Sequence, residues 1–274
     1  MAHPLVDVSA LLEVGSSARV RAAVAAAIGS ALRTRGYFYA QRVHLLPAPY
    51  ISSIYAFARR AHALPPHVKA RYAQRGGTGA YSGPDIGQPE IEYEPGKTSP
   101  ACSWDYMRER FSLAAEATDG TAGDRYPGEA EGLSPTFEEV LDDLYERQNI
   151  LARALLSGIG AALGLPPDTL LELSGHGDGG GDMGTIRLIS YPGEDGAVVD
   201  GGEGKGEDDV GIGAHTDFEL FTLMHQDASG LQLLPRSADQ ARPAAAPPRD
   251  RHDSHAEAAT AGGARVGRRA GEAR

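Results

Sequence analysis

The sequence predicts an α+β protein in which helices pack around a small sheet in the amino-terminal half and further strands follow in the carboxyl-terminal half. Apolar residues recur at helical spacing through much of residues 18–163, and strand-like segments occur at 103–111 and 215–234. With 274 residues, the chain can bury a sizeable core as one large domain or two modest ones.

Two helices are expected in the amino-terminal part. The first ends at Gly36, a residue type that commonly follows the last helical turn. Its apolar side chains repeat at helical spacing and are Val20, Val24, Ala27, Ile28 and Ala31. The second runs from about Ala48 to Ala63, because Pro65-Pro66 follows and a residue before proline disfavours the helical conformation.

Residues 103–111 are expected to form a strand that leads back to the core. Trp104, Tyr106, Arg108 and Arg110 alternate along it. These side chains either line a substrate pocket or take part in core packing and surface ion pairs, and the spacing alone leaves both readings open.

The longest helix is expected after this strand. Ser134 can cap it and Pro135 suits its first turn, while Gly164 and Pro166-Pro167 close it. One continuous apolar stripe runs along it: Phe137, Val140, Leu141, Leu144, Leu151, Leu155, Ile159 and Leu163.

The stretch from Gly193 to Gly213 is rich in glycine and acidic residues. It lacks the ordered alternation and the terminal glutamate of a calcium-binding loop, so it is interpreted as a solvated insertion.

The pair His215 and Asp217 is the main chemical signal. Side chains two apart on a strand point to the same face, so an imidazole and a carboxylate at this spacing can hold one metal ion together. Together with a second, distant histidine they would form the facial triad of non-haem Fe(II) oxygenases. A turn containing Gly230 follows, and the segment predicts a hairpin of two strands over residues 215–224 and 231–234.

The run from His215 to Leu234 resembles the isopenicillin N synthase-like branch of the Fe(II)/2-oxoglutarate-dependent dioxygenases. Other segments resemble landmarks of that family in the same order, over about residues 4 to 235. They are Pro4-Leu5-Val6-Asp7-Val8, Arg35-Gly36-Tyr37-Phe38-Tyr39, Leu64-Pro65-Pro66-His67-Val68-Lys69, Gly79-Ala80-Tyr81-Ser82-Gly83 and Ile186-Arg187-Leu188-Ile189-Ser190-Tyr191-Pro192.

The resemblance implies a double-stranded β-helix (jelly-roll) core, incomplete at its C-terminal end, with a helical N-terminal domain. It implies an N-terminal dioxygenase domain over residues 1–130, part of the catalytic domain over 131–235, and a disordered tail over 236–274. It also implies Fe(II), 2-oxoglutarate as cosubstrate, O2 and a small-molecule substrate. His215 and Asp217 would be metal ligands, and the hydroxyl of Tyr191 would bind the cosubstrate carboxylate.

The family's distal histidine and its Arg-x-Ser clamp have no match in the sequence. His252 and His255 lie in the tail without apolar alternation around them, and Arg268 and Arg269 lack a serine at the family's spacing. A two-ligand site holds Fe(II) weakly. The hypothesis is that a shifted reading frame or a read-through intron replaces the true end of the barrel after about residue 235.

Composition restricts the partners and the location. The formal net charge of −11 argues against nucleic acid and anionic membranes as partners. Residues 236–274 differ from the rest, with eight arginines, five acidic residues and Val266 as the one large apolar residue. This composition predicts disorder. A single cysteine, Cys102, and the lack of a spanning or signal segment predict a cytoplasmic location, with Cys102 as a packed side chain.

Two other functions remain open. The chain is alternatively a noncatalytic member of the family that acts as an interaction module. A two-ligand hydrolase site is disfavoured, because no general base accompanies His215 and Asp217. The sequence names neither the substrate nor the type of oxidation.

Overall fold

The computed structural model describes residues 3–74, 80–89, 99–108, 125–166, 168–174, 184–191, 211–213, 215–217 and 219–233. By its internal contacts the chain divides after Arg236. The predicted disordered tail, residues 236–274, lies outside the described residues, so the structure does not test how the tail arose. Most of the Gly-rich stretch from Gly193 to Gly213 also lies outside them.

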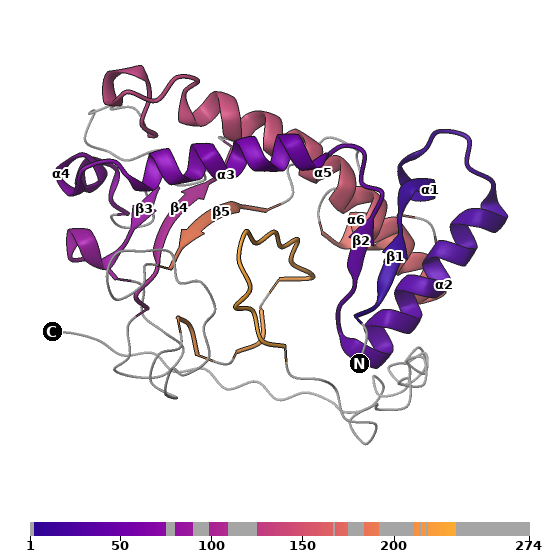
Figure 1. Cartoon of the computed structure of the whole chain (residues 1–274). Helices are drawn as coiled ribbons and strands as arrows, with labels where there is room; N and C mark the ends of the chain where they lie inside the picture. Colours follow the sequence, from indigo (N-terminus) through magenta and orange to yellow (C-terminus); the bar gives the residue numbers. More distant parts are fainter. Residues whose placement is uncertain are drawn as a thin grey trace, which may run out of the picture. The chain divides into compact units, whose positions relative to one another are not determined.

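The elements follow one another from a short strand to a final edge strand (Figure 1). The amino-terminal elements are β1 (Leu5–Asp7), α1 (Ser9–Leu12), α2 (Ala18–Arg35), β2 (Tyr39–Gln41), α3 (Ala48–His62), α4 (Pro66–Lys69) and the 3-10 turn η1 (Ala70–Tyr72). The later elements are β3 (Tyr81–Ser82), η2 (Pro84–Ile86), β4 (Cys102–Tyr106), η4 (Glu129–Glu131), α5 (Phe137–Ala162), α6 (Thr169–Leu173) and β5 (Ile186–Ser190). No described helix has the length and apolar character needed to cross a membrane.

The two predicted amino-terminal helices are confirmed as α2 and α3. Ser17 caps α2 by accepting a hydrogen bond from the Val20 amide, and Gly36 ends it with φ of 82°. That left-handed conformation is one that glycine adopts without steric cost, which explains why the helix stops there.

The longest helix, α5, is confirmed, but its cap differs from the prediction. Thr136, not Ser134, is the N-cap, and its side chain accepts from the Glu139 amide while the Glu139 carboxylate accepts from the Thr136 amide. This reciprocal pair satisfies two amides that have no partner within the helix. The glutamate three residues after Thr136 decides the start of the helix, since Ser134 has no such residue at that spacing.

The strands form two small sheets in the described residues. β1 and β2 pair in parallel, and β3, β4 and β5 form an antiparallel sheet in that order. The strand predicted over 103–111 is β4, which ends earlier, at Tyr106, within the described residues. Arg110 lies outside them.

Helices α3 and α5 cover one face of the β3–β4–β5 sheet (Figure 1). Trp104 of β4 is fully buried, with its ring centroid 4.6 Å from that of Tyr81 and 5.3 Å from that of Phe137 on α5. Phe57 of α3 packs on the same Phe137 ring. Of the two readings for Trp104 and Tyr106, core packing is therefore the right one, because both side chains are buried in this aromatic cluster.

The hairpin predicted over residues 215–224 and 231–234 is wrong for the described part of the segment. Residues 215–217 and 219–233 contain no strand. A strand is stable only when its amides and carbonyls pair with a neighbour, and no described strand lies beside this segment to provide that ladder. The described part of the chain is therefore α+β, and its sheets are smaller than those of a jelly roll.

A buried ion pair fixes the turn between β3 and β4. Lys69 Nζ lies 2.9 Å from Asp85 Oδ2, and the Tyr81 hydroxyl donates to the same carboxylate. Burial alone would raise the pKa of Asp85, but the hydrogen bonds from Lys69 and Tyr81 outweigh it and hold that pKa below its ordinary value. Burial raises the pKa of the Cys102 thiol beside this carboxylate, as expected for a packed side chain and not for a nucleophile.

His62 joins α3 to the edge strand β5. Its Nε2 lies 3.0 Å from the carbonyl oxygen of Leu188, so the ring donates a hydrogen bond from Nε2. Burial is the main cause that lowers the pKa of His62 to about 4, and the positive charge of Lys69 lowers it further. The ring therefore remains uncharged in the folded protein well below pH 6.

We predict that His62 makes the folded state sensitive to mild acid. Its pKa in the folded state, about 4, is below the ordinary value of 6.5, so the unfolded chain binds the proton more readily between these values. The contribution of His62 is complete above pH 6.5 and is lost as the pH falls toward 4. Between pH 6.5 and pH 4, the free energy of unfolding measured by urea titration should fall about 2 kcal/mol less in His62→Gln than in the parent. Equal slopes for both proteins would contradict the prediction.

We also predict that Lys69→Met destabilises the fold by about 2 to 3 kcal/mol, because it leaves the partly buried carboxylate of Asp85 without its cation. The matched control is Arg42→Met, which removes the exposed ion pair with Asp7 and should cost less than about 1 kcal/mol. Chemical unfolding midpoints of the two variants measure the difference. A loss in Lys69→Met no larger than in the control would refute the role of the buried pair.

Candidate functional site

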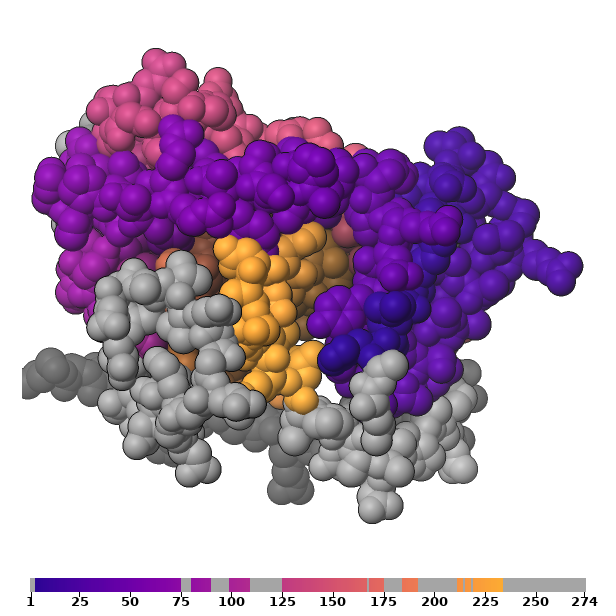
Figure 2. Space-filling model, viewed as in Figure 1, coloured from indigo at the N-terminus to yellow at the C-terminus, as the bar shows by residue number. Residues whose placement is uncertain are grey.

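The three predicted site residues lie on two neighbouring segments. Tyr191 directly follows β5, and His215 and Asp217 belong to residues 211–233, here called the motif segment. The motif segment runs below α3 in the view of Figure 2, where it is the orange-yellow surface. Arg59 of α3 forms an ion pair with Asp227 at 3.2 Å, and Phe221 and Leu223 pack against the core. Side-chain contacts therefore hold this segment, because its described residues make no strand hydrogen bonds.

The side chains of His215 and Asp217 face each other. His215 Nε2 lies 3.3 Å from Asp217 Oδ1, and the two side chains are 21 % and 46 % exposed. The second carboxylate oxygen of Asp217 accepts a hydrogen bond of 2.5 Å from the Thr222 hydroxyl. The expected convergence of the two groups is therefore present although the strand expected to produce it is not.

The second ring nitrogen of His215 has its own partner. Nδ1 lies 2.9 Å from the carbonyl oxygen of Gly213, two residues earlier. In the tautomer with the proton on Nδ1, this nitrogen donates to the carbonyl and Nε2 directs a lone pair toward Asp217. Metal-binding histidines nearly always use their second nitrogen in this way, because the hydrogen bond fixes the ring and selects the tautomer.

The pair fits a divalent metal ion. Two ligand atoms that are each about 2.1 Å from an ion and at right angles to each other lie about 3 Å apart. The Nε2 to Oδ1 separation of 3.3 Å is close to that geometry. Among the described residues, no group of three or more His, Cys, Asp and Glu side chains surrounds a common point. His252 and His255 lie outside the described residues.

Tyr191 lies against the start of the motif segment. A Cβ atom placed on Gly211 would be 2.5 Å from Cδ1 of the Tyr191 ring, so the ring packs directly on the glycine backbone. The Ser99 hydroxyl donates to the Gly211 carbonyl at 3.1 Å. Gly211 was not predicted as a site residue. Its position four residues before His215 could have indicated it, because a glycine lets another side chain approach the backbone closely.

The face of the sheet that leads to Tyr191 carries a charge pair. Asp105 of β4 pairs with Arg187 of β5, with Arg187 Nε 3.1 Å from Asp105 Oδ1. Neither residue was singled out from the sequence as a site residue, although alternation along β4 places Asp105 opposite the buried Trp104 and Tyr106.

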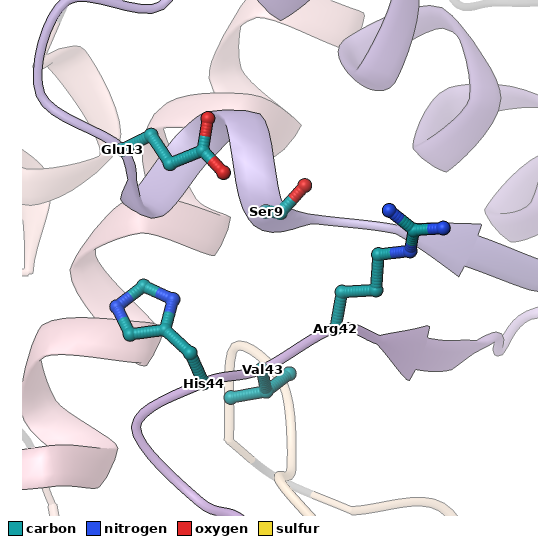
Figure 3. A pocket seen from close by; sticks show the side chains of 5 residues that line it. All are labelled: Ser9, Glu13, Arg42, Val43 and His44. Atoms are coloured by element: carbon teal, nitrogen blue, oxygen red, sulfur yellow. The ribbon is translucent and has the colours of Figure 1, made fainter.

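A separate pocket of about 300 Å³ opens between α1 and the loop after β2 (Figure 3). It is lined by Ser9, Glu13, Arg42, Val43 and His44. The Arg42 guanidinium is engaged by Asp7. None of the predicted site residues lines this pocket.

The amino-terminal part of the chain matches a known family. Residues 3–130 match the family described as "non-haem dioxygenase in morphine synthesis N-terminal". The match covers the residues from the beginning of β1 to η4.

Several curated proteins are related to a longer part of the chain. The 2-oxoglutarate-Fe(II) type oxidoreductase ppzC of Metarhizium rileyi is 26 % identical over 268 residues, covering 87 % of this chain and 64 % of the relative. Clavatol oxidase claD of Penicillium crustosum is 28 % identical over 235 residues, covering 82 % and 66 %. A homoarginine-6-hydroxylase of Glycine max is 37 % identical over 93 residues, covering 34 % and 26 %. The chain thus spans less than two thirds of the length of each relative.

Solved structures show the same fold. A full-length Neurospora crassa protein in complex with alpha-KG superposes with a TM-score of 0.51 at 17 % identity, covering 69 % of this chain and 54 % of that one. A C-terminally truncated apo form of that protein gives the same TM-score at 18 % identity, covering 69 % and 62 %. The family match over residues 3–130 shows that the amino-terminal part of the chain is similar to non-haem dioxygenases, and the named relatives show that a longer part is similar to 2-oxoglutarate-Fe(II) type oxidoreductases.

Proposed function

We propose that the protein is a non-haem Fe(II)- and 2-oxoglutarate-dependent dioxygenase that oxidises a small organic metabolite. The observation that carries this proposal is the geometry of His215 and Asp217, with ligand atoms 3.3 Å apart and the second histidine nitrogen held by a carbonyl. The names of the relatives agree with it, since they include 2-oxoglutarate-Fe(II) type oxidoreductases and a hydroxylase.

Each predicted site residue receives one role. His215 Nε2 and Asp217 Oδ1 would hold the metal ion, and Thr222 would orient the carboxylate of Asp217 by its hydrogen bond. Bound Fe(II), with 2-oxoglutarate and O2, would supply an oxidant strong enough to break a C–H bond while the cosubstrate is decarboxylated to succinate. The Tyr191 hydroxyl would donate a hydrogen bond to the distal carboxylate of 2-oxoglutarate.

The proposal includes the domain division expected from the sequence. Residues 1–130 would be the N-terminal domain of the family, residues 131–235 the first part of the catalytic domain, and residues 236–274 a tail without a packed core. β5 and the motif segment would then belong to a jelly-roll core. The proposed catalytic activity is that of the whole protein. This chain spans less than two thirds of the length of its relatives.

The alternative is a noncatalytic family member that acts as an interaction module. One observation favours it: β5 is an edge strand of the described sheet, and exposed apolar side chains lie on β5 and in the motif segment. They are Ile189, Leu220, Met224, Leu231 and Leu233. Metal binding and turnover separate the two functions.

We predict that His215→Ala and Asp217→Ala each weaken Fe(II) binding at least about 100-fold, because loss of a ligand costs more than loss of a residue that only orients one. Anaerobic titration calorimetry measures the affinity. Succinate formed from 2-oxoglutarate with Fe(II) and ascorbate, without a prime substrate, should fall to background in both variants.

The matched control is Glu219→Ala, which removes an exposed carboxylate two residues from Asp217 and should leave both measurements unchanged. Succinate production that survives in His215→Ala would place the metal elsewhere. A parent protein that binds iron but forms no succinate would favour the noncatalytic alternative.

We further predict that Gly211→Ala weakens 2-oxoglutarate binding about tenfold, the effect of one lost hydrogen bond to a charged group. The added methyl group would occupy the position of the Tyr191 ring and displace its hydroxyl. The control is Gly230→Ala in the same segment, where a Cβ atom meets nothing within 4 Å. Equal affinities in the two variants, measured by calorimetry with Mn(II) in place of Fe(II), would remove Tyr191 from the cosubstrate site.

A further inference from the structure

The pocket between α1 and the loop after β2 contains none of the residues of the proposed metal site (Figure 3). Its volume of about 300 Å³ is sufficient for a small organic molecule. Ser9 and Glu13 line it from α1 and the end of that helix, and Arg42, Val43 and His44 line it from the loop. Two segments that are distant in the sequence therefore form its walls.

The backbone of Arg42 has an uncommon conformation. Its φ of 57° lies in the left-handed region, which residues other than glycine seldom adopt. The His44 amide donates to the Arg42 carbonyl at 3.1 Å, and the Val8 amide donates to the Gln41 carbonyl at 3.1 Å. These bonds fix the chain on both sides of Arg42. Such conformations persist where the surrounding contacts hold them, and they are concentrated at functional sites, including those that clamp a ligand.

The guanidinium of Arg42 is held along one edge. Its Nε lies 3.2 Å from Asp7 Oδ2, and the side chain is 77 % exposed. Ser9 fixes Asp7 by donating to Oδ1 from its hydroxyl at 2.7 Å and from its amide at 3.0 Å. These two bonds, chiefly that of the hydroxyl, hold the pKa of Asp7 below its ordinary value. Within the described residues, nothing bonds to Nη1 or Nη2 of Arg42, so both nitrogens can donate to a ligand.

Glu13 supplies the opposite charge. Figure 3 shows Glu13 and Arg42 on opposite sides of the pocket, with Ser9 between them. In the part of the chain that the structure describes, neither the Glu13 carboxylate nor the His44 ring has a hydrogen-bond partner. The half-buried Val43 is the apolar member of the lining. An unpaired carboxylate therefore lies across the pocket from a guanidinium with two available nitrogens.

This arrangement selects a ligand that carries two charges. A simple cation would be attracted by Glu13 and repelled by Arg42, and a simple anion would meet the reverse. A molecule with an ammonium group at one end and a carboxylate at the other end matches both side chains. A guanidinium can hold a carboxylate through two parallel N–H groups, and an ammonium group donates a charge-assisted hydrogen bond to a carboxylate.

We propose that this pocket binds a small zwitterion, namely a free amino acid. The ammonium group of the ligand donates to Glu13, its carboxylate accepts from Nη1 and Nη2 of Arg42, and its carbon chain lies on Val43. None of the lining residues belongs to β5 or to the motif segment. The inference therefore goes beyond the proposed function and does not depend on it.

The test compares ligands that carry both charges with ligands that carry one. The amino acids are glycine, 4-aminobutanoate and 6-aminohexanoate, and each is matched with the amine and the carboxylic acid of the same chain length. Titration calorimetry on the full chain, without added metal, measures binding. We expect at least one amino acid to bind about tenfold more tightly than its two matched ligands, because each of these lacks one charged hydrogen bond.

Two variants locate the binding. Glu13→Gln and Arg42→Met should each weaken the best amino acid about tenfold, because each removes one of the two charged partners. Both side chains are exposed, so the fold should be retained, which circular dichroism checks. The matched control is Arg71→Met, which removes an arginine held by Glu131 outside the pocket and should leave the affinity unchanged.

Three results would overturn the inference. In the first, no amino acid binds the parent more tightly than its matched amine and acid. In the second, the best amino acid keeps its affinity in Glu13→Gln or in Arg42→Met. In the third, Arg71→Met weakens binding as much as these variants do. The comparison of ligands on the parent holds even if a variant fails to fold.

Discussion

The packing of Trp104 between the sheet and helix α5 is the interaction on which the rest of the structure depends. Its ring contacts Tyr81 on the neighbouring strand and Phe137 at the start of α5, and Phe57 brings α3 to the same cluster. Fully buried aromatic side chains contribute large areas of apolar contact, so this cluster holds together α3, β3, β4 and α5, which are distant in the sequence. The sheet consequently turns its polar face away from the helices.

This division of the sheet explains where chemistry can occur. Beside the core, the Lys69–Asp85 pair and the neutral His62 ring join neighbouring elements and use their polar atoms for structure. The outer face carries Arg187, Asp105 and, beyond β5, Tyr191. The buried face packs against the helices, and the opposite face carries the charge pair of Arg187 and Asp105.

The proposed metal-binding motif shows how local contacts can replace regular structure. His215 is oriented by the Gly213 carbonyl and Asp217 by the Thr222 hydroxyl, so both partners lie within five residues of the side chain that they orient. The motif segment is attached to the helical part through Arg59, Phe221 and Leu223 and through the contact between Gly211 and Tyr191. The convergence of imidazole and carboxylate therefore does not require a complete barrel.

Local sequence was sufficient wherever the determining interactions are local. Helical periodicity and Gly36 predicted α2, and the apolar stripe predicted α5, because helical hydrogen bonds close within four residues. The cap of α5 was misplaced by two residues, since two candidate residues compete and the Glu139 side chain decides between them. The hairpin was misjudged for a different reason. Alternation describes a side chain's preference, whereas strand formation requires a partner that the periodicity of one segment does not specify.

By itself, the sequence determined helices α2, α3 and α5, the position of β4, and the residue types that can hold a metal ion, because these follow from spacing along one chain. Only the tertiary structure decided which face of the sheet is buried and that Arg187 meets Asp105 across two strands. It also decided that Gly211 lies under the ring of Tyr191. These contacts join residues that are far apart in sequence, and their energies depend on burial and register, which no short segment contains.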